Sequence, residues 1–140
     1  MQIPLVLMSP DSFISRPPLW LRAVSRHRAT ITGGPNFAYA LCMRRIPDPA
    51  LEQLDLGSLR HAFNGAEPVS AALMAAFARR FARCGLQHGA LRPVYGLAEA
   101  TLAVTYPQRR SLRWLDVDPT ALAREGRVVP GLRAVLGTNS

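Results

Sequence analysis

A short, mainly apolar segment that runs into a glycine corner constrains the fold of this chain more than any other feature. Leu91–Val94 forms the apolar approach, Tyr95 and Gly96 follow it, and Glu99 lies just inside the start of a helical pattern. In open α/β sheets, ligands bind at the carboxyl ends of the strands, and helix N-termini favour anions. The segment therefore predicts a strand-to-helix corner that could hold a nucleotide-sized ligand.

The rest of the chain alternates short apolar runs with helical patterns, which predicts an α/β fold. The expected strands lie near residues 3–8, 29–32, 59–64, 91–94 and 102–106. The expected helices are a short turn after Asp11 or Ser12, a helix from Pro17 or Pro18 to His27, one from Phe37 to Arg45, one from Ser70 to Arg83, and a single turn at Ala98–Leu102. Asn36 and Ser70 are the expected N-caps, and Gly85 is expected to end the helix that Ser70 begins.

The character of the chain changes at Pro107, where a charged break, Gln108–Arg110, follows the last expected strand. Beyond it, the pattern predicts a helical turn capped by Asp118 and a short strand at Val128 and Val129. We therefore divide the chain into residues 1–106 and residues 107–140.

The charge balance points in principle to a polyanionic partner, because 17 basic and 9 acidic residues give a net charge of +8. However, the basic residues are all arginines, with no lysine, and they are scattered along a chain rich in Ala, Leu and Pro. Such a composition is typical of a GC-rich coding sequence and not of a nucleic-acid-binding surface, so we expect no nucleic-acid partner. A length of 140 residues and a hydrophobic content of 49% suffice for one domain with a core.

Two cysteines, Cys42 and Cys84, lack the close spacing of a zinc site and predict reduced, buried thiols in a cytoplasmic protein. The apolar stretch Met1–Met8 lacks the basic start of a signal peptide. No apolar run approaches the roughly 18 residues needed to span a bilayer. The three histidines, His27, His61 and His88, show neither triad nor ligand spacing.

Three motifs, in the order of a known family, carry a resemblance that covers roughly residues 5 to 130. Tyr95-Gly96-Leu97-Ala98-Glu99-Ala100-Thr101 resembles the Tyr-Gly-x-Thr/Ala-Glu adenylate-binding motif of the AMP-forming adenylating enzymes, a superfamily with acyl-CoA synthetases and nonribosomal-peptide adenylation domains. Asn64–Pro68 and Gly33–Tyr39 resemble the two preceding motifs. With Ala before the Glu, this version of the motif is most similar to that of the fatty acyl-AMP ligases. The resemblance implies an α/β fold that is a partial layered sheet-and-helix subdomain of the large N-terminal, AMP-binding domain.

The resemblance also implies roles for particular residues. Those that would bind the nucleotide are Gly65, Ala66, Glu67, Tyr95, Gly96 and Ala98; those that would bind the acyl group are Gly34, Phe37 and Leu97; and Glu99 would bind Mg²⁺. The residue types suit these roles, because glycine lets a flat base approach the backbone, a tyrosine ring can stack on adenine, and a carboxylate is a hard oxygen ligand.

Each of these residues also has an ordinary structural explanation. Glu99 could be a solvated or capping carboxylate, Tyr95 could belong to the core, Glu67 could contact its own turn, and Gly33-Gly34 could only punctuate a turn. Ala98 lacks the hydroxyl of the Thr that other family members carry there, and Thr101 is a weak candidate for replacing it. The order and spacing of the motifs favour the binding site.

The activity implied by the resemblance is ATP-dependent activation of a fatty acid as an acyl-adenylate, for transfer to an acyl carrier protein or polyketide synthase. Two alternatives stay open: an acyl-CoA synthetase, with CoA as the acceptor, and an inactive remnant that serves as an interaction module. The family's lysine-bearing phosphate loop and small C-terminal domain have no counterpart here. We therefore expect a fragment without a complete catalytic set and without ligase activity alone. Residues 107–140 resemble the insertion that distinguishes fatty acyl-AMP ligases from acyl-CoA synthetases.

Overall fold

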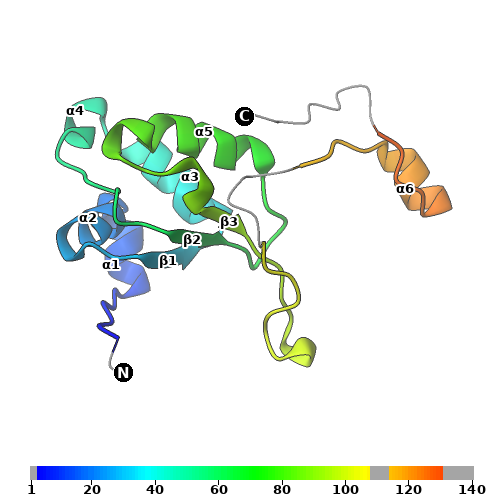
Figure 1. Ribbon diagram of the computed structural model, residues 1–140, viewed down its shortest axis with the longest axis horizontal. Helices are drawn as coiled ribbons and strands as arrows, with labels where there is room; N and C mark the ends of the chain where they lie inside the picture. Colours follow the sequence, from blue (N-terminus) through cyan, green and yellow to red (C-terminus); the bar gives the residue numbers. More distant parts are fainter. Residues whose placement is uncertain (1–2, 108–113, 131–140) are drawn as a thin grey trace.

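A three-stranded parallel sheet forms the centre of the computed structural model, which describes residues 3–107 and 114–130 (Figure 1). Its strands are β1 (Ile31–Gly34), β2 (His61–Asn64) and β3 (Leu91–Pro93), in the order β1-β2-β3. Ile31 lies opposite His61, and Ala62 lies opposite Leu91. Because parallel neighbours need long crossovers, helices connect the strands, as the α/β prediction requires.

Helices lie above one face of the sheet and beside its β1 edge. They are α1 (Pro10–Ser15), α2 (Pro18–His27), α3 (Asn36–Arg45), α4 (Asp48–Leu51), α5 (Ala71–Phe81) and α6 (Pro119–Glu125), with short 3-10 turns at η1 (Ala82–Cys84), η2 (His88–Ala90) and η3 (Ala98–Ala100). Figure 1 shows α3 and α5 side by side above the sheet, while α1 and α2 lie towards its β1 edge. In the described residues, no helix is both long enough and apolar enough to cross a membrane.

Helix α5 forms as its sequence predicts. Ser70 is the N-cap, and its side chain accepts a hydrogen bond from the amide of Leu73 at 3.2 Å, an interaction worth about 1 kcal/mol. After the short turn η1, Gly85 adopts a left-handed φ of 82°, which ends the helical segment. The side chains that α5 buries are Met74, Phe77, Ala78 and Phe81. The predicted Met and Phe stripe is therefore core packing.

Tyr39 lies at the centre of this core. Its ring makes edge contacts with Trp20 and Phe77, at centroid distances of 5.1 and 5.0 Å. Its hydroxyl donates a hydrogen bond to the carbonyl of Phe63 at 2.7 Å, which ties α3 to β2. Burial, and secondarily the nearby Cys42, raises the pKa of Tyr39 well above its usual range.

The two thiols are free and buried, as predicted. Burial raises the pKa of Cys42 to about 12. Burial also raises the pKa of Cys84, although the Arg83 and Arg80 guanidinium groups act in the opposite direction. Both thiols are therefore held in the neutral form.

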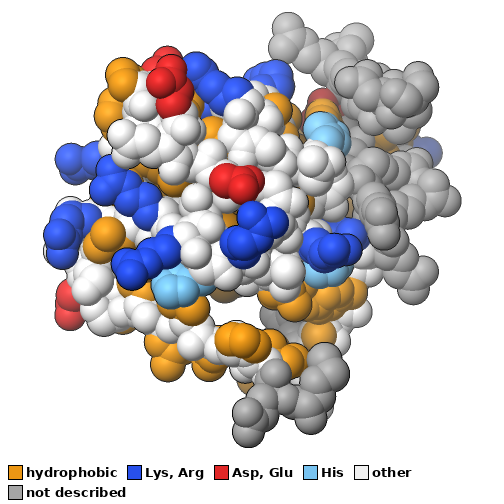
Figure 2. Space-filling view, turned by 60° about the vertical axis from the view of Figure 1, so that its left-hand side comes forward, with side chains coloured by type: hydrophobic (Ala, Val, Ile, Leu, Met, Phe, Trp, Pro, Cys, Tyr) orange, Lys and Arg blue, Asp and Glu red, His pale blue; other side chains and the backbone are white. Residues whose placement is uncertain are grey.

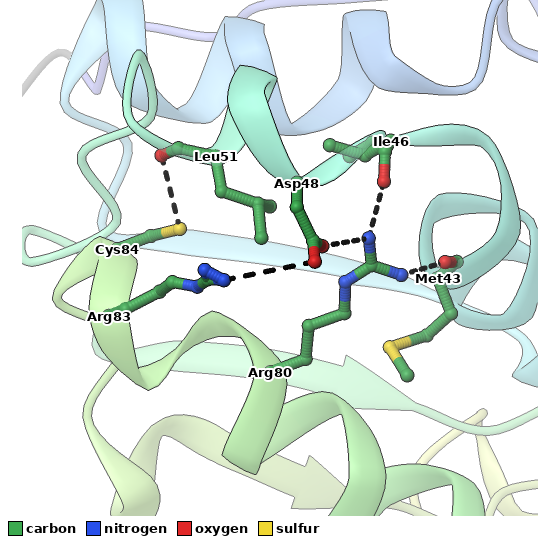
Figure 3. A network of polar contacts seen from close by, with 7 residues as sticks. All are labelled: Met43, Ile46, Asp48, Leu51, Arg80, Arg83 and Cys84. Carbon is green, nitrogen blue, oxygen red and sulfur yellow. Dashed lines mark hydrogen bonds and ion pairs between the residues drawn. The ribbon is translucent and has the colours of Figure 1, made fainter.

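Arg80 joins three helices (Figure 3). From α5 its guanidinium donates to the carbonyls of Met43 and Ile46 at the end of α3, and to Asp48 of α4 at 3.0 Å. Arg83 approaches the same carboxylate only to 3.9 Å. Since the last carbonyls of a helix lack intrahelical partners, Arg80 satisfies groups that α3 leaves open.

The expected strand at residues 3–8 is wrong. This segment has no regular structure, and the side chains of Ile3, Leu5 and Leu7 are 78 to 82% exposed. A strand needs a neighbour for its main-chain groups, and none of the described strands pairs with this segment.

The first strand and the first cap of the predicted sheet are also shifted. The expected strand 29–32 is displaced to β1 at Ile31–Gly34, so that both glycines lie inside it. Gly33 fits there because a Cβ would come within 3.2 Å of the Phe63 Cβ on the neighbouring strand. Asn36 is the first residue of α3 and not its N-cap, which is Pro35.

The two late strands are likewise wrong, whereas the late helix is confirmed. Residues 102–106 form only an isolated antiparallel bridge between Tyr95 and Thr105, and the expected pair at 128–129 is replaced by a bridge between Val117 and Pro130. The Asp118 carboxylate caps α6 by accepting from the amides of Thr120 and Ala121. The break at 108–110 lies outside the described residues, and the division of the chain at residue 107 stays a prediction.

Candidate functional site

Three loops meet where the strands end. Because β1, β2 and β3 are parallel, their carboxyl ends share one edge of the sheet. The segments that leave it are Pro35–Phe37, where α3 begins at Asn36, and the loops Gly65–Glu67 and Val94–Gly96. This edge brings together the three motifs that lie about thirty residues apart in the sequence. The strand-to-helix corner predicted at residues 91–102 is the third of these loops.

Two asparagines fix the first loop to the second. Asn64 is fully buried at the end of β2, and its Nδ2 donates to Asn36 Oδ1 at 2.9 Å and to the sulfur of Met74 at 3.0 Å. Asn36 Oδ1 also accepts from the amide of Ser70 at 3.1 Å, while its Nδ2 donates to the carbonyl of Pro68. Asn36 thus links the start of α3 with the chain before α5, a role that sequence reasoning missed.

The turn at Gly65, Ala66 and Glu67 is tightly built. A Cβ on Gly65 would lie 2.7 Å from the carbonyl oxygen of Val94, so only glycine fits against the third loop. Ala66 adopts a left-handed φ of 68°. The Glu67 carboxylate accepts from the amide of Phe37 at 3.4 Å, which supports a structural role for Glu67. The turn is therefore in contact with both neighbouring loops.

Tyr95 is 61% exposed and is not part of the core. Its main chain closes the loop that follows: its carbonyl accepts from the amides of Val104 and Thr105, both at 3.0 Å. Figure 1 shows this loop, in yellow, projecting from the edge of the sheet. An exposed ring at the end of a fixed strand can stack on a flat base.

The loop after Tyr95 is close to its steric limit. A Cβ on Gly96 would lie 1.5 Å from the carbonyl oxygen of Leu102, so the close approach of these two backbones requires glycine. Thr101 and Leu102 adopt left-handed φ values of 54° and 82°. Such conformations are costly for residues with a side chain and concentrate at functional sites.

Glu99 lies in η3 with an exposed side chain, next to the exposed Ala98. The described residues include no group of three or more His, Cys, Asp or Glu side chains that could hold a metal ion. One carboxylate nonetheless fits Mg²⁺, which uses one or two protein carboxylates together with phosphate oxygens and water. Its role as a magnesium ligand stays a prediction.

An apolar cavity of about 610 Å³ lies beside β1. Its lining includes two of the three residues predicted to bind the acyl group, Gly34 and Phe37, whereas Leu97, half-buried in the Tyr95 loop, does not line it. The ring of Trp20, which forms part of the wall, is oriented by a hydrogen bond from Nε1 to Thr32 Oγ1 at 2.7 Å. The volume is in the range of small-molecule sites.

Known proteins match the chain over most of its length. The family described as AMP-binding enzyme matches residues 3–137. The medium-chain-fatty-acid–[acyl-carrier-protein] ligase TtuA of Teredinibacter turnerae is 42% identical over 128 residues, which cover 91% of this chain and 20% of that protein. The 4-hydroxyphenylalkanoate adenylyltransferase of Mycobacterium tuberculosis is 46% identical over 99 residues, or 71% of this chain and 16% of that protein.

Solved structures agree with this match. A fatty acyl-adenylate ligase from L. pneumophila, in complex with acyl adenylate and pyrophosphate, has a TM-score of 0.75 at 46% identity and covers 79% of this chain. The adenylation domain of a keto acid-selecting NRPS module has a TM-score of 0.73 at 28% identity. The sheet and helices thus form part of the adenylation-domain fold. The chain spans about a fifth of the length of these relatives.

Proposed function

The chain belongs to the AMP-binding enzyme family, and on that premise we propose that it supplies part of the adenylate site of an ATP-dependent ligase that activates a fatty acid. In this reaction a carboxylate oxygen attacks the α-phosphorus of ATP, the bond to the β-phosphate oxygen breaks, and pyrophosphate leaves. The observation that carries the proposal is the contact of the Gly65 turn with Val94, which places that turn beside Tyr95 at one edge of the sheet.

Each part of the proposed site would bind a different part of the nucleotide. The Gly65–Glu67 turn offers main-chain groups to the edge of the adenine, and the exposed Tyr95 ring covers its face. Gly96 and Ala98 leave room for the phosphates beside the loop backbone. Glu99 would hold Mg²⁺, which neutralises phosphate charge when bound.

The acyl group would enter the apolar cavity beside β1. Gly34 and Phe37 line this cavity, and Leu97 would approach the carboxyl end of the substrate from the Tyr95 loop. The name of TtuA specifies a medium-chain fatty acid, whereas that of the M. tuberculosis relative specifies a 4-hydroxyphenylalkanoate. A fatty acid is the substrate we propose, because the cavity wall is built mainly from apolar side chains.

An acyl carrier protein is the acceptor we propose, because the name of TtuA specifies one. The carrier could stand alone or belong to a polyketide synthase. CoA is the alternative acceptor, and the same assay distinguishes them: thioester formation with free CoA would favour an acyl-CoA synthetase. The two unpaired, buried thiols fit the cytoplasmic location that we expect.

Binding of a non-hydrolysable acyl-adenylate analogue tests the nucleotide half of the proposal. The chain is titrated by calorimetry in the presence of Mg²⁺, together with Tyr95→Ala and the control Tyr106→Ala. Tyr106 is also largely exposed, but it contacts the Phe63 ring. We expect saturable binding that is weakened only in Tyr95→Ala. Equal affinities in the two variants would contradict the assigned position of the base.

A chimera tests the activity. The matching segment of TtuA is replaced with this chain, and fatty-acid-dependent exchange of pyrophosphate into ATP is measured. Glu99→Ala should lower exchange and raise the Mg²⁺ concentration required, whereas Glu52→Ala, an exposed carboxylate after α4, should change neither. A folded chimera that forms no acyl-adenylate would contradict the proposed function.

A further inference from the structure

A hollow of about 290 Å³ lies where α1 ends and α2 begins. Its lining includes three arginines, Arg16, Arg22 and Arg45, which come from the end of α1, the first turns of α2 and the last turn of α3. Pro17, Pro18 and Leu19 form the remaining surface with Ser15, so no carboxylate among the described residues lines the hollow. None of the residues assigned to the adenylate site or to the acyl cavity lines it.

The three guanidinium groups lack partners within the described part of the chain. Four other described arginines pair with carboxylates, as Arg28 does with Asp55 and Arg80 with Asp48, whereas several, such as Arg26, do not. The side chains of Arg16, Arg22 and Arg45 likewise make no ion pair or hydrogen bond with any described residue, and they are set apart because all three line one hollow. Residues 1–47 contain six arginines but only one acidic residue, Asp11.

Two main-chain carbonyls beside the hollow already have partners. The carbonyl of Arg16 accepts from the amide of Leu19 at 2.9 Å, and that of Pro17 accepts from the amide of Trp20 and the thiol of Cys42. Three like charges around one hollow repel each other, so an anion placed between them would stabilise the folded chain. Figure 2 brings forward the side of the molecule on which Figure 1 places α1 and α2; arginines (blue) are widespread in this view and carboxylates (red) are few.

The shape and donors of the hollow favour a phosphate group. Guanidinium forks match phosphate oxygens bidentately, and the planar group is weakly hydrated. The helix N-terminus contributes no free donor, because Pro17 and Pro18 lack an amide N–H and the amide of Leu19 is bonded. An anion would therefore be held by side chains, namely the three guanidinium groups and the hydroxyl of Ser15. The apolar surface of Pro18 and Leu19 leaves room for an organic substituent.

We propose that Arg16, Arg22 and Arg45 form a binding site for a phosphate-bearing ligand, separate from the adenylate site. The two prolines restrict the main chain between α1 and α2, while the three arginine side chains are exposed to an incoming ligand. The source of the phosphate is either an organic ester, whose substituent packs on Pro18 and Leu19, or inorganic phosphate.

Calorimetric titrations of the chain in chloride buffer test the site, with phenyl phosphate, inorganic phosphate and phenol as probes. We expect saturable binding of the phosphates and none of phenol. Tighter binding of phenyl phosphate identifies an organic ester as the ligand, and equal binding identifies inorganic phosphate. Absence of saturable phosphate binding by the folded chain would overturn the proposal.

Matched variants separate the site from the general positive charge of the chain. Arg22→Ala should weaken phosphate binding about tenfold or more, because it removes a charge-assisted pair of hydrogen bonds. Arg26→Ala makes the same change in charge on the same helix but does not line the hollow, and should have little effect. Equal losses in the two variants would show that only the overall field attracts the anion.

One further variant tests whether the phosphate binds at the arginine hollow or at the adenylate site. Tyr95→Ala should retain phosphate binding, whatever it does to the acyl-adenylate analogue. Loss of phosphate binding in a folded Tyr95→Ala chain would place the probe at the adenylate site and overturn the separate site.

Discussion

The turn after β2 and the loop after β3 provide the two halves of the proposed nucleotide site, but the chain holds them in different ways. The Gly65–Glu67 turn contacts the loops on both sides, through the backbone of Val94 and the amide of Phe37. The loop after Tyr95 is closed mainly by hydrogen bonds within its own backbone, and residues 98–106 are exposed.

This difference predicts different responses to mutation and to ligand. The turn follows the buried Asn64, and its glycine packs against Val94, although Ala66 and Glu67 are exposed; a change at Gly65 therefore alters the stability of the fold. The loop makes few contacts with the core, so a change there alters the loop alone. The turn would provide a preformed surface for the edge of the base. The loop would adapt to the face of the base and to the phosphates, so that the site could close on its ligand.

The largest expected effect on stability is that of Gly65→Ala. The new methyl group would lie 2.7 Å from the carbonyl oxygen of Val94 and 2.9 Å from its Cγ2, in a place where the backbone on both sides is fixed. We expect the free energy of unfolding to fall by about 2 kcal/mol or more, as for an overpacked core. Urea unfolding followed by circular dichroism measures it. A loss below about 0.5 kcal/mol would show that the turn is not rigid.

Gly96→Ala makes the same chemical change in the other half. The methyl group would overlap the carbonyl oxygen of Leu102, so the loop must open. Because the loop is exposed, we expect the free energy of unfolding to change by less than about 1 kcal/mol. Affinity for the acyl-adenylate analogue should fall about tenfold or more, since the loop that carries Tyr95 is displaced. A large loss of stability would remove the distinction between the two halves.

Tyr95→Ala narrows the comparison to one ring. Its side chain is largely exposed, so we expect a stability change within about 0.5 kcal/mol. Loss of stacking on a base should weaken binding of the analogue about tenfold, which corresponds to about 1.4 kcal/mol. Tyr95→Phe should retain the affinity, because it keeps the ring face. Equal weakening in Tyr95→Phe would indicate that the hydroxyl, and not the ring, contacts the ligand.

Sequence reasoning predicted the elements around the Gly65–Glu67 turn better than the loop after Tyr95. Helix α5, its cap at Ser70 and its end at Gly85 followed from periodicity and capping preferences, which are local. The strands expected near residues 59–64 and 91–94 are present as β2 and β3. The loop after Tyr95 was predicted to continue as a strand, because Leu102–Tyr106 alternates, yet alternation does not provide a partner for an edge strand.

Two features of the structure depend on contacts that no local pattern contains. Asn36 was interpreted as a cap of α3, but its side chain bonds to Asn64, Pro68 and Ser70, which lie about thirty residues further along the chain. The apolar run at residues 3–8 was interpreted as a strand, although a strand also requires an available neighbour. Composition alone likewise did not predict that three unpaired arginines share one hollow.

The dependence of stability on alkaline pH tests the core that supports the Gly65–Glu67 turn. Burial raises the pKa of Cys42 on α3 to about 12, whereas a thiol in the unfolded chain has a pKa of about 8.5. Below pH 8.5 the Cys42 thiol keeps its proton in both the folded and the unfolded chain, so stability is unchanged. Above pH 8.5 the thiol ionises first in the unfolded chain, so stability falls until the pH reaches the pKa of the thiol in the folded chain. We expect the free energy of unfolding to drop by about 1 kcal/mol from Cys42 between pH 7 and pH 9. Under reducing conditions, Cys42→Ala should lose that much less over the same interval, with Cys84 contributing to the remaining slope; equal slopes in the two proteins would show that the thiol of Cys42 is not held neutral by the core.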